Sequence, residues 1–519
     1  MNHEDFLNQM KKMIDELKAM STDFGLSNTG DEYKIISDFF TYKFLNEKII
    51  FHYENHEQCE ISFDDFIDVA DPEIPRMRQH HFIDHLQKQK DRENFHEILE
   101  QAFREVSTLN KDVYHIEMAS GRKRQLFEPL SVYIRDEEKE LGIAKRAIGI
   151  LAKYKFPGIH NGGFDYFSSI FEHLIRDYNK DSGKYAEYFT PLFAGSLIAD
   201  ILYNDTQPKT SVTIYDPSAG SGTLLLALAN KIGTANCKLY SQDISQKSTH
   251  FLRINLILNN LTHSLSDIIE GNTIANPQHV EEGEIKKFDF IVSNPPFKMD
   301  FSHMISNIES DTYNRFFAGT PKIPKKNKRS MAIYELFLQH IMASLSESGK
   351  AAIVVPTGFT TAAKGISKVI RQRIVEKNWL RGVLHMPSHI FATTATSVSI
   401  IFIDKAKAND TVLLMDASNM GSKHSFRDGR KTILYPEEEN KITSYFKNNI
   451  EETEFSVLVS NQDILENDCS ILAGQYVDLR EEEIDFDIDE RLAQLTSSLI
   501  QNLHESQKIS ASLLKKLEE

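Results

Sequence analysis

The chain has 519 residues, of which 41% are hydrophobic and 26% are charged, and its formal net charge is -16. A chain of this length is longer than a single domain with one hydrophobic core usually is, which indicates about two to four domains. The composition is typical of soluble globular proteins. The negative net charge argues against a protein that binds DNA strongly without a partner, because such proteins usually carry a basic face. It is compatible with local basic patches, or with a partner that holds the nucleic acid.

The sequence shows no sign of export or of membrane insertion. No apolar run is long enough to cross a bilayer, and the charged start lacks the apolar core of a secretion signal. The three cysteines, Cys59, Cys237 and Cys469, lie far apart, which indicates neither a disulfide framework nor a zinc site. We therefore expect a cytoplasmic protein that has no structural or catalytic metal and no contact with a membrane.

Residues 1–160 are predicted to form an N-terminal α-helical domain. Apolar side chains recur at helical spacing in residues 4–20, 33–51, 94–106 and 144–154. A short basic run, Arg122 to Arg124, is a weak candidate for contact with DNA.

From about residue 185, strand-like runs alternate with helices. The predicted strands are residues 212–216, 237–243, 288–294, 350–356, 381–387 and 398–404. The predicted helices between them are residues 222–232, 248–260 and 330–349, the last closed by Gly349. This alternation predicts an α/β fold with a mostly parallel, doubly wound sheet that is covered on both faces. Ligands then belong at the carboxyl ends of the strands.

The end of the chain, residues 485–519, is predicted to be a C-terminal helical tail. Its leucines recur at helical spacing, as in Leu492, Leu495, Leu499 and Leu503. Two interpretations stay open: the helix packs on its own domain, or it docks on a partner subunit.

A glycine loop (residues 216–223) joins a predicted strand to the next helix. Gly220 and Gly222 permit a tight turn and the close approach of a ligand. The loop lacks the lysine of a Walker loop, and Leu225 stands where a dinucleotide fingerprint has its third glycine. Asp216 would repel a pyrophosphate and favours a cationic or amino-bearing ligand. S-adenosylmethionine, which carries a sulfonium and an ammonium, is such a ligand.

Two polar residues end the segments that follow. Asp243 ends the next strand, where an acid can accept hydrogen bonds from ribose hydroxyls; a solvated loop aspartate is the alternative. Asn272 ends the segment after that, and it is either a turn residue or a contact to the adenine of a cofactor.

A proline corner (residues 293–297, "SNPPF") follows an apolar run directly. Its simple interpretation is a strand that ends in a rigid turn. In the functional interpretation, the Asn294 amide oxygen and the Pro295 carbonyl are two acceptors held in fixed directions. They could receive both hydrogens of an exocyclic amine and draw its lone pair towards an electrophilic methyl group. Phe297 offers a flat face to a base flipped out of a duplex.

A basic stretch (residues 322–329) follows the proline corner. It contains Lys322, Lys325, Lys326, Lys328 and Arg329, the densest positive charge in this acidic chain. A solvated loop is one interpretation. Its position between the proline corner and the next helix favours a DNA-facing flap, whose phosphate contacts would position a duplex without reading its sequence.

In combination, these motifs resemble those of the amino-methyltransferases of DNA in which the cofactor motif precedes the catalytic one. More narrowly, the chain resembles the modification subunits of type I restriction-modification systems, which are gamma-type adenine N6 methyltransferases. The likeness is carried by "AEYFTP" at 186–191, "DPSAGSG" at 216–222 and "SNPPF", and it continues through residues 349–358, 383–404 and 459–472. It covers roughly residues 160–480.

The resemblance implies a Rossmann-like, S-adenosylmethionine-dependent methyltransferase domain over residues 161–484. "EYFTP" would close over the methionine end of the cofactor, with Thr190 bonded to its polar atoms, and Asp243 would take the ribose. Family members often have aspartate where this chain has Asn272, whose amide oxygen can still accept from the adenine amine. The predicted cofactor-binding residues are Glu187, Tyr188, Phe189, Thr190, Pro191, Leu192, Asp216, Gly220, Ser221, Gly222, Thr223, Asp243 and Asn272. The predicted catalytic residues are Asn294, Pro295, Pro296 and Phe297.

The resemblance also implies a division of labour. The expected partners are double-stranded DNA, a specificity subunit that chooses the site, a second modification subunit and, in the full complex, a restriction subunit. The Asn-Pro-Pro-Phe form usually goes with adenine N6, and Ser-Pro-Pro forms with cytosine N4. The alternatives are a stand-alone DNA amino-methyltransferase, a methyltransferase of protein glutamine or RNA, and a binding subunit without turnover.

Overall fold

The computed structural model describes residues 3–27, 31–56, 61–70, 74–111, 116–117, 123–156, 190–203, 210–391, 397–426, 429–476 and 488–518. Contacts divide the chain into two compact units, Met1–Tyr476 and Val477–Glu519. No described helix combines the length and the apolar composition needed to cross a bilayer.

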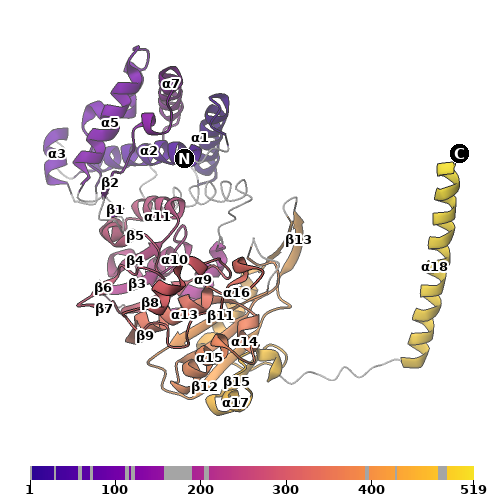
Figure 1. The fold of residues 1–519 in the computed structure, drawn as a ribbon. Coiled ribbons are helices and arrows are strands. Elements are labelled where there is room, and N and C mark those ends of the chain that lie inside the picture. The colour runs from indigo at the N-terminus through magenta and orange to yellow at the C-terminus, as the bar shows by residue number, and fades with distance from the viewer. Residues whose placement is uncertain are drawn as a thin grey trace. The chain divides into compact units, whose positions relative to one another are not determined.

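The amino-terminal part of the first unit is helical, as the periodicity predicts. Its helices include α1 (His3–Asp23), α2 (Glu32–Glu54), α3 (Phe63–Val69), α4 (Ile83–Gln89), α5 (Phe95–Leu109) and α7 (Glu137–Lys153), with a two-stranded pair of β1 (Ile116–Glu117) and β2 (Lys123–Arg124) (Figure 1). Aromatic rings form much of the core between these helices. The ring of Phe103 lies 5.7 Å from that of Phe39, 5.1 Å from Tyr42 and 5.0 Å from Phe127.

The rest of the first unit is built on a nine-stranded sheet, counted over the described residues. The strands are β3 (Val212–Asp216), β4 (Cys237–Asp243), β5 (Ile268–Glu270), β8 (Phe288–Ser293), β9 (Leu345–Pro356), β10 (Leu380–His385), β11 (Val398–Asp404), β12 (Thr411–Asp416) and β15 (Ser456–Ser460). Their order is β15-β12-β10-β11-β9-β8-β3-β4-β5, and only β11 and β15 run against the others. The predicted α/β fold class is thus confirmed.

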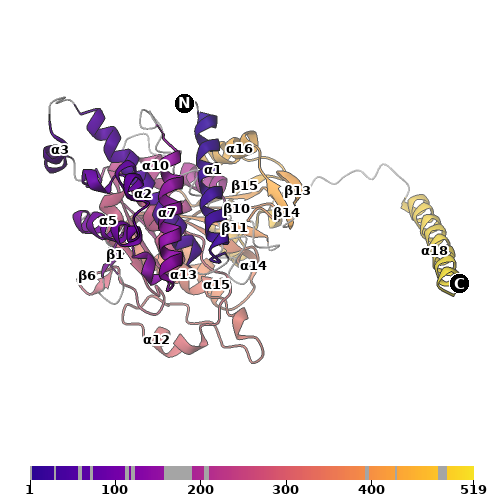
Figure 2. The ribbon, with the colours of Figure 1, turned by 90° about the horizontal axis from the view of Figure 1, so that it is seen from above.

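Helices connect the strands in the manner expected of a doubly wound sheet. They include α9 (Leu192–Leu202), α10 (Thr223–Ile232), α11 (Gln246–Leu258), α12 (Ile305–Glu309), α13 (Tyr334–Ser344), α14 (Gly358–Thr361), α15 (Ile366–Glu376), α16 (Pro436–Asn448) and α17 (Asn461–Glu466). Two hairpins, β6 (Val280–Glu281) with β7 (Glu284–Ile285) and β13 (Ser422–Phe426) with β14 (Gly429–Ile433), stand outside the sheet. Seen from above, α12 and the loops on either side of it extend beyond α13 and α15 (Figure 2).

The helical part contacts the sheet part through α11 and the turn after it. Arg253 on α11 donates from Nη1 to the carbonyl oxygen of Gln125 at 2.9 Å. Lys48 on α2 donates from Nζ to Oδ1 of Asn260 at 2.8 Å. Since α11 also follows the strand that ends in Asp243, the helical part is held against the same connection that shapes the candidate ligand site.

One predicted helix is too long. The helix expected over residues 330–349 ends at Ser344 as α13, and Leu345 already belongs to β9. Gly349 therefore lies within a strand and does not close a helix. A Cβ atom there would stand 2.9 Å from the carbonyl oxygen of Phe288, at the point where the register between β8 and β9 shifts. The sheet pairing overrides the helical periodicity of this stretch.

The second unit is the helix α18 (Ile488–Glu518). Its apolar stripe is solvent-exposed within that unit. The exposed side chains include Leu492, Leu495, Leu499, Ile500, Leu503 and Ile509, each more than half exposed. A helical tail is thus present, and its docking partner stays a prediction.

We expect Gly349→Ala to lower the free energy of unfolding by about 1–3 kcal/mol, because the new Cβ would collide with backbone atoms of β8 and β9. Chemical denaturation monitored by circular dichroism would measure this loss. Gly474→Ala is the matched control, since a Cβ there meets nothing within 4 Å. Equal stabilities of the two variants would contradict the proposed reason for this glycine.

Candidate functional site

The carboxyl ends of β3, β4, β5 and β8 surround one cavity of about 530 Å³. This volume falls in the range of small-molecule sites. The lining residues are Pro217, Ser218, Gly220, Asp243, Ile244, Ser245, Ser248, Asn272, Thr273, Ile274, Asn294, Pro296, Met299, Ile333 and Phe337. The cavity lies where the strand order reverses around β3, which is the position expected for a ligand in a doubly wound sheet.

The glycine loop has the backbone geometry that its sequence predicts. Gly220 has φ +55° and Gly222 has φ +90°, values that favour glycine. A Cβ on Gly222 would stand 2.3 Å from Cδ1 of Leu252, so the loop is packed tightly on α11. The carbonyl of Ser221 accepts from Nδ2 of Asn255 at 2.8 Å, and Thr223 begins α10.

Asp243, at the end of the neighbouring strand β4, stabilises the glycine loop through hydrogen bonds. Its Oδ2 accepts from the backbone N–H of Gly220 at 2.9 Å, and its Oδ1 accepts from that of Ser245 at 2.8 Å. Because Asp243 also lines the cavity, a carboxylate oxygen and the loop backbone are presented to a ligand together. The next residue, Ile244, is 61% exposed and contributes an apolar face to the same wall.

Asp216 lies behind the cavity and does not line it. Its side chain is 2% exposed, and its Oδ1 accepts from the backbone N–H of Ser218 at 2.9 Å. Burial raises the pKa of Asp216 to about 8, against the lowering effect of that hydrogen bond. The structure therefore does not place this carboxylate at the cavity surface, and its predicted contact with a cationic ligand stays a prediction.

Asn272 is a turn residue in the structure. Its Oδ1 accepts from the backbone N–H groups of Ile274 and Ala275 at 3.1 and 3.0 Å, and its Nδ2 donates to Sδ of Met304. It also lines the cavity, so its contact with an adenine stays a prediction. With its oxygen engaged by two backbone donors, the amide is more readily a donor than an acceptor towards a ligand.

The proline corner ends β8 at the edge of the cavity. Asn294 is 9% exposed and donates from Nδ2 to Oγ1 of Thr190 at 3.1 Å. Among the described residues, none donates a hydrogen bond to Oδ1 of Asn294 or to the carbonyl of Pro295. The corner therefore presents two acceptors that no described residue engages. Ser293 bonds Oγ of Ser218 at 2.8 Å, which ties the corner to the loop after β3.

Phe297 is buried, with 6% of its surface exposed, and its ring lies edge-on to Tyr334 at a centroid distance of 6.4 Å. It does not line the cavity in this structure. Its predicted stacking on a base therefore requires a rearrangement of this ring pair.

The remaining predicted residues fall in three places. Thr190 meets the proline corner, Pro191 caps α9 and Leu192 begins it. Glu187, Tyr188 and Phe189 lie outside the described residues. The five cations of the basic stretch are all exposed, and no described carboxylate lies within ion-pair distance of them.

Sequence reasoning missed much of the apolar cavity wall. Ile274, Met299, Ile333 and Phe337 come from the loop after β5 and from residues 298–337, which follow the corner. Ile274, Ile333 and Phe337 belong to one buried cluster with Phe301, Ile308, Met331 and Leu336. No local motif marks them, because apolar residues at irregular spacing become a wall only when distant segments pack. Ile244 had a usable signal, its place directly after the acidic strand end.

Comparison with known proteins agrees with this geometry. The family model described as N-6 DNA Methylase matches residues 163–485. The type I restriction enzyme MpnII methylase subunit of Mycoplasma pneumoniae is 27% identical over 408 residues, covering 74% of this chain and 72% of the relative. The HindI methylase subunit of Haemophilus influenzae is 23% identical over 454 residues, covering 80% and 97%.

Solved structures show the same fold. A type I restriction-modification methyltransferase subunit from Streptococcus thermophilus matches with a TM-score of 0.71 at 21% identity, over 92% of this chain and 100% of the other. A modification subunit of a putative type I restriction enzyme from Vibrio vulnificus matches with a TM-score of 0.57 at 16% identity, over 88% and 93%. The resemblance drawn from the sequence motifs is confirmed.

We expect Asp216→Asn to change how stability depends on pH. The folded pKa of Asp216, about 8, lies above its unfolded value, so the folded state holds a proton that the unfolded state releases. Stability from this group is present at low pH and is lost as the pH rises from about 4 through about 8. The variant should therefore gain in melting temperature relative to wild type between pH 5 and pH 8.

Differential scanning fluorimetry across that pH range tests this expectation. Asp15→Asn replaces an exposed carboxylate and serves as the control. A constant difference between Asp216→Asn and wild type at all pH values would show that Asp216 is ionised in the folded protein throughout.

Proposed function

Because the chain belongs to the N-6 DNA methylase family, we propose that it transfers a methyl group from S-adenosylmethionine to N6 of an adenine flipped out of duplex DNA. The observation that carries this proposal is the proline corner at the edge of the cavity. There, the acceptors of Asn294 and Pro295 have no described protein partner, and Asn294 itself lines the cavity.

The cavity suits the proposed cofactor. S-adenosylmethionine supplies an electrophilic methyl group when it is bound. The carboxylate of Asp243 would accept from ribose hydroxyls, and the exposed face of Ile244 would pack against the adenine ring. The glycine loop lets the backbone approach closely, and the apolar lining residues Ile333 and Phe337 would exclude water from the site.

The proline corner would act on the target amine. Oδ1 of Asn294 and the carbonyl of Pro295 accept its two hydrogens, so the nitrogen lone pair is turned out of ring conjugation. The nitrogen would form its new bond to the methyl carbon as the carbon–sulfur bond breaks, S-adenosylhomocysteine would be the leaving group, and the proton of the methylated amine would pass to solvent. Thr190 accepts from Nδ2 of Asn294, which fixes the amide so that its oxygen is the atom left for the substrate.

Contact with DNA is proposed for the basic stretch. Its five cations are exposed and unpaired among the described residues, and they follow the proline corner in the chain. They would hold phosphates, which position a duplex without specifying its sequence. The net charge of -16 agrees with a division of labour in which a further subunit supplies strong binding at a particular site.

We therefore assign the chain to a type I complex as its modification subunit. The proposed partners are a specificity subunit, a second modification subunit and, in the full complex, a restriction subunit. The relatives from Mycoplasma pneumoniae and Haemophilus influenzae bear the names of type I methylase subunits, which favours this proposal over a stand-alone enzyme. The exposed leucine stripe of α18 is a surface of the kind that such a partner covers.

The function itself is tested with tritiated S-adenosylmethionine and DNA from a strain that lacks this gene. The native complex should label the DNA, and hydrolysis should yield N6-methyladenine. Label in N4-methylcytosine, in RNA or in protein glutamine would contradict adenine N6 as the substrate and would indicate the labelled group instead.

Asn294→Ala should lower the rate of methyl transfer by at least about 10²-fold, because one of the two acceptors for the amine is lost. Binding of S-adenosylhomocysteine, measured by calorimetry, should remain close to wild type. Asn448→Ala, an exposed residue on α16, should keep full activity. An unchanged rate of methyl transfer in Asn294→Ala would contradict the proposed chemistry.

Replacing Lys325 and Lys326 by alanine should weaken DNA binding uniformly across sequences. It should also reduce the salt dependence, with a change of about 1–2 in the slope of log K against log salt concentration. Fluorescence anisotropy over a range of salt concentrations would measure both. Replacing the exposed pair Lys11 and Lys12 removes the same charge from α1 and should leave the slope unchanged. Equal effects of the two double variants would indicate a general charge effect.

A further inference from the structure

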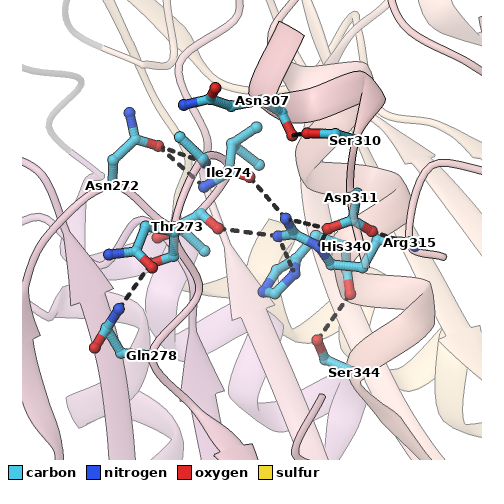
Figure 3. Close-up of polar contacts among 12 residues, drawn as sticks. Asn272, Thr273, Ile274, Gln278, Asn307, Ser310, Asp311, Arg315, His340 and Ser344 are labelled. Atoms are coloured by element: carbon cyan, nitrogen blue, oxygen red, sulfur yellow. Dashed lines mark hydrogen bonds and ion pairs between the residues drawn. The ribbon is translucent and has the colours of Figure 1, made fainter. Parts of the chain in front are cut away.

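A buried arginine holds the wall of the cavity. Arg315 is 2% exposed, and its guanidinium donates to the carbonyl oxygens of Thr273 at 3.0 Å and Ile274 at 2.7 Å. Both acceptor residues line the cavity. Figure 3 shows the guanidinium between these two residues on one side and Asp311 and His340 on the other.

Asp311 balances the buried charge. Its Oδ1 lies 2.9 Å from Nε and 2.7 Å from Nη2 of Arg315, and its Oδ2 accepts from the backbone N–H of Arg315 at 2.8 Å. The side chains are 7% and 2% exposed, respectively. A lone charge here would be strongly unfavourable, so this pair and its two carbonyls form one unit.

The same guanidinium is connected to β3 of the sheet through His340. Nη1 of Arg315 lies 3.3 Å from Nδ1 of His340, and Nε2 of His340 lies 3.0 Å from the hydroxyl of Tyr215 on β3. Burial and the positive charge of Arg315 hold the pKa of His340 well below its usual range. A neutral His340 accepts from Arg315 at Nδ1 and donates from Nε2 to Tyr215, so the chain of hydrogen bonds has one consistent direction.

Arg315 belongs to the post-corner segment (residues 298–333), which also carries the basic stretch. On one side, the basic stretch is anchored next to Arg315: the backbone N–H of Ala318 donates to Oε1 of Gln339 at 2.7 Å, and Nε2 of Gln339 donates to the carbonyl of Gly319 at 3.1 Å. On the other side, the carbonyl of Met331 accepts from the backbone N–H of Met299 at 3.1 Å. The basic stretch is thus a loop whose two ends are fixed.

The end at Met331 also adjoins the cavity wall. Met299 and Ile333 line the cavity directly, and Met331 and Ile333 share a buried cluster with Ile274. Thr273 is held in turn by bonds from its Oγ1 to the carbonyls of Pro217 at 2.7 Å and Gln242 at 3.1 Å. A change in the post-corner segment therefore reaches the loop after β5 through direct contacts, among which the Arg315 fork supplies two buried hydrogen bonds from a charged group.

We propose that Arg315 is a positioning residue that couples binding in the cavity to binding of DNA at the basic stretch. The inference rests on the proposed function for the identity of the two ligands. DNA that orders the post-corner segment also orders the carbonyls of Thr273 and Ile274, so the cofactor meets a wall that is already in place. By linkage, bound cofactor favours DNA to the same extent.

The coupling is measured as a ratio of two dissociation constants. Calorimetry gives the affinity of the native complex for S-adenosylhomocysteine, which binds without turnover, in the absence and presence of duplex DNA from a strain lacking this gene. Wild type should bind it about tenfold more tightly with DNA present, within the usual range of coupling between sites. In Arg315→Lys this ratio should fall below about twofold, because one ammonium cannot replace a fork that serves a carboxylate and two carbonyls.

A matched control separates coupling from stability. Arg371 is 1% exposed and donates to the carbonyls of Cys469, Phe359 and Ala362, none of which lines the cavity. Arg371→Lys should lower the melting temperature and keep the tenfold ratio. If Arg315→Lys fails to fold, the double variant Asp311→Leu with Arg315→Met removes both charges, a change that buried pairs often tolerate, and it should show the same loss of coupling.

Four outcomes are distinct. The inference would be overturned if the Arg315 variants kept the wild-type ratio of dissociation constants without and with DNA. It would also be overturned if that ratio fell equally in Arg371→Lys. A wild-type complex that binds S-adenosylhomocysteine equally with and without DNA would also overturn it. A wild-type complex that binds no S-adenosylhomocysteine at all would instead contradict the proposed function.

Discussion

The parallel pairing of β3 with β4 on one side and β8 on the other is the constraint on which the site depends. Parallel strands end at the same edge of a sheet, so Asp216, Asp243 and Ser293 are brought together although they are far apart in the chain. Hydrogen bonds then join the three strand ends, from Gly220 to Asp243 and from Ser218 to Ser293. The glycine loop and the proline corner acquire their relative position from this pairing.

The environment of each carboxylate follows from its depth below that edge. Asp243 faces the cavity, where solvent and two backbone N–H donors favour its charge. Asp216 is covered by the loop that follows it, and burial raises its pKa. Two acids at the ends of neighbouring strands therefore lie in different surroundings, and only Asp243 offers a carboxylate oxygen directly to the cavity.

The second side of the cavity is made by the post-corner segment, which forms its own small core and is held to the loop after β5 by Arg315. No sequence motif predicted this side of the cavity. Arg315 lies in no motif, and an arginine would ordinarily be expected on the surface. It is buried because Asp311 and two backbone carbonyls, one of them 42 residues away in sequence, satisfy its donors. The helix predicted to end at Gly349 failed for a related reason, because Leu345 pairs with Phe288 of β8 and residues 345–349 belong to β9.

The sequence was sufficient to predict the alternation of strands and helices, the glycine loop and the proline corner, since these depend on local rules: periodicity, the φ freedom of glycine and the φ restriction of proline. It also determined the family, because three motifs in order are far more specific than any one of them. Tertiary structure alone decided which residues face the cavity. It buried Asp216, used the oxygen of Asn272 in a turn, paired Phe297 with Tyr334 and placed Thr190 against Asn294. The physical reason is that burial and hydrogen-bond partners are properties of packed surfaces from distant segments, and no local pattern records them.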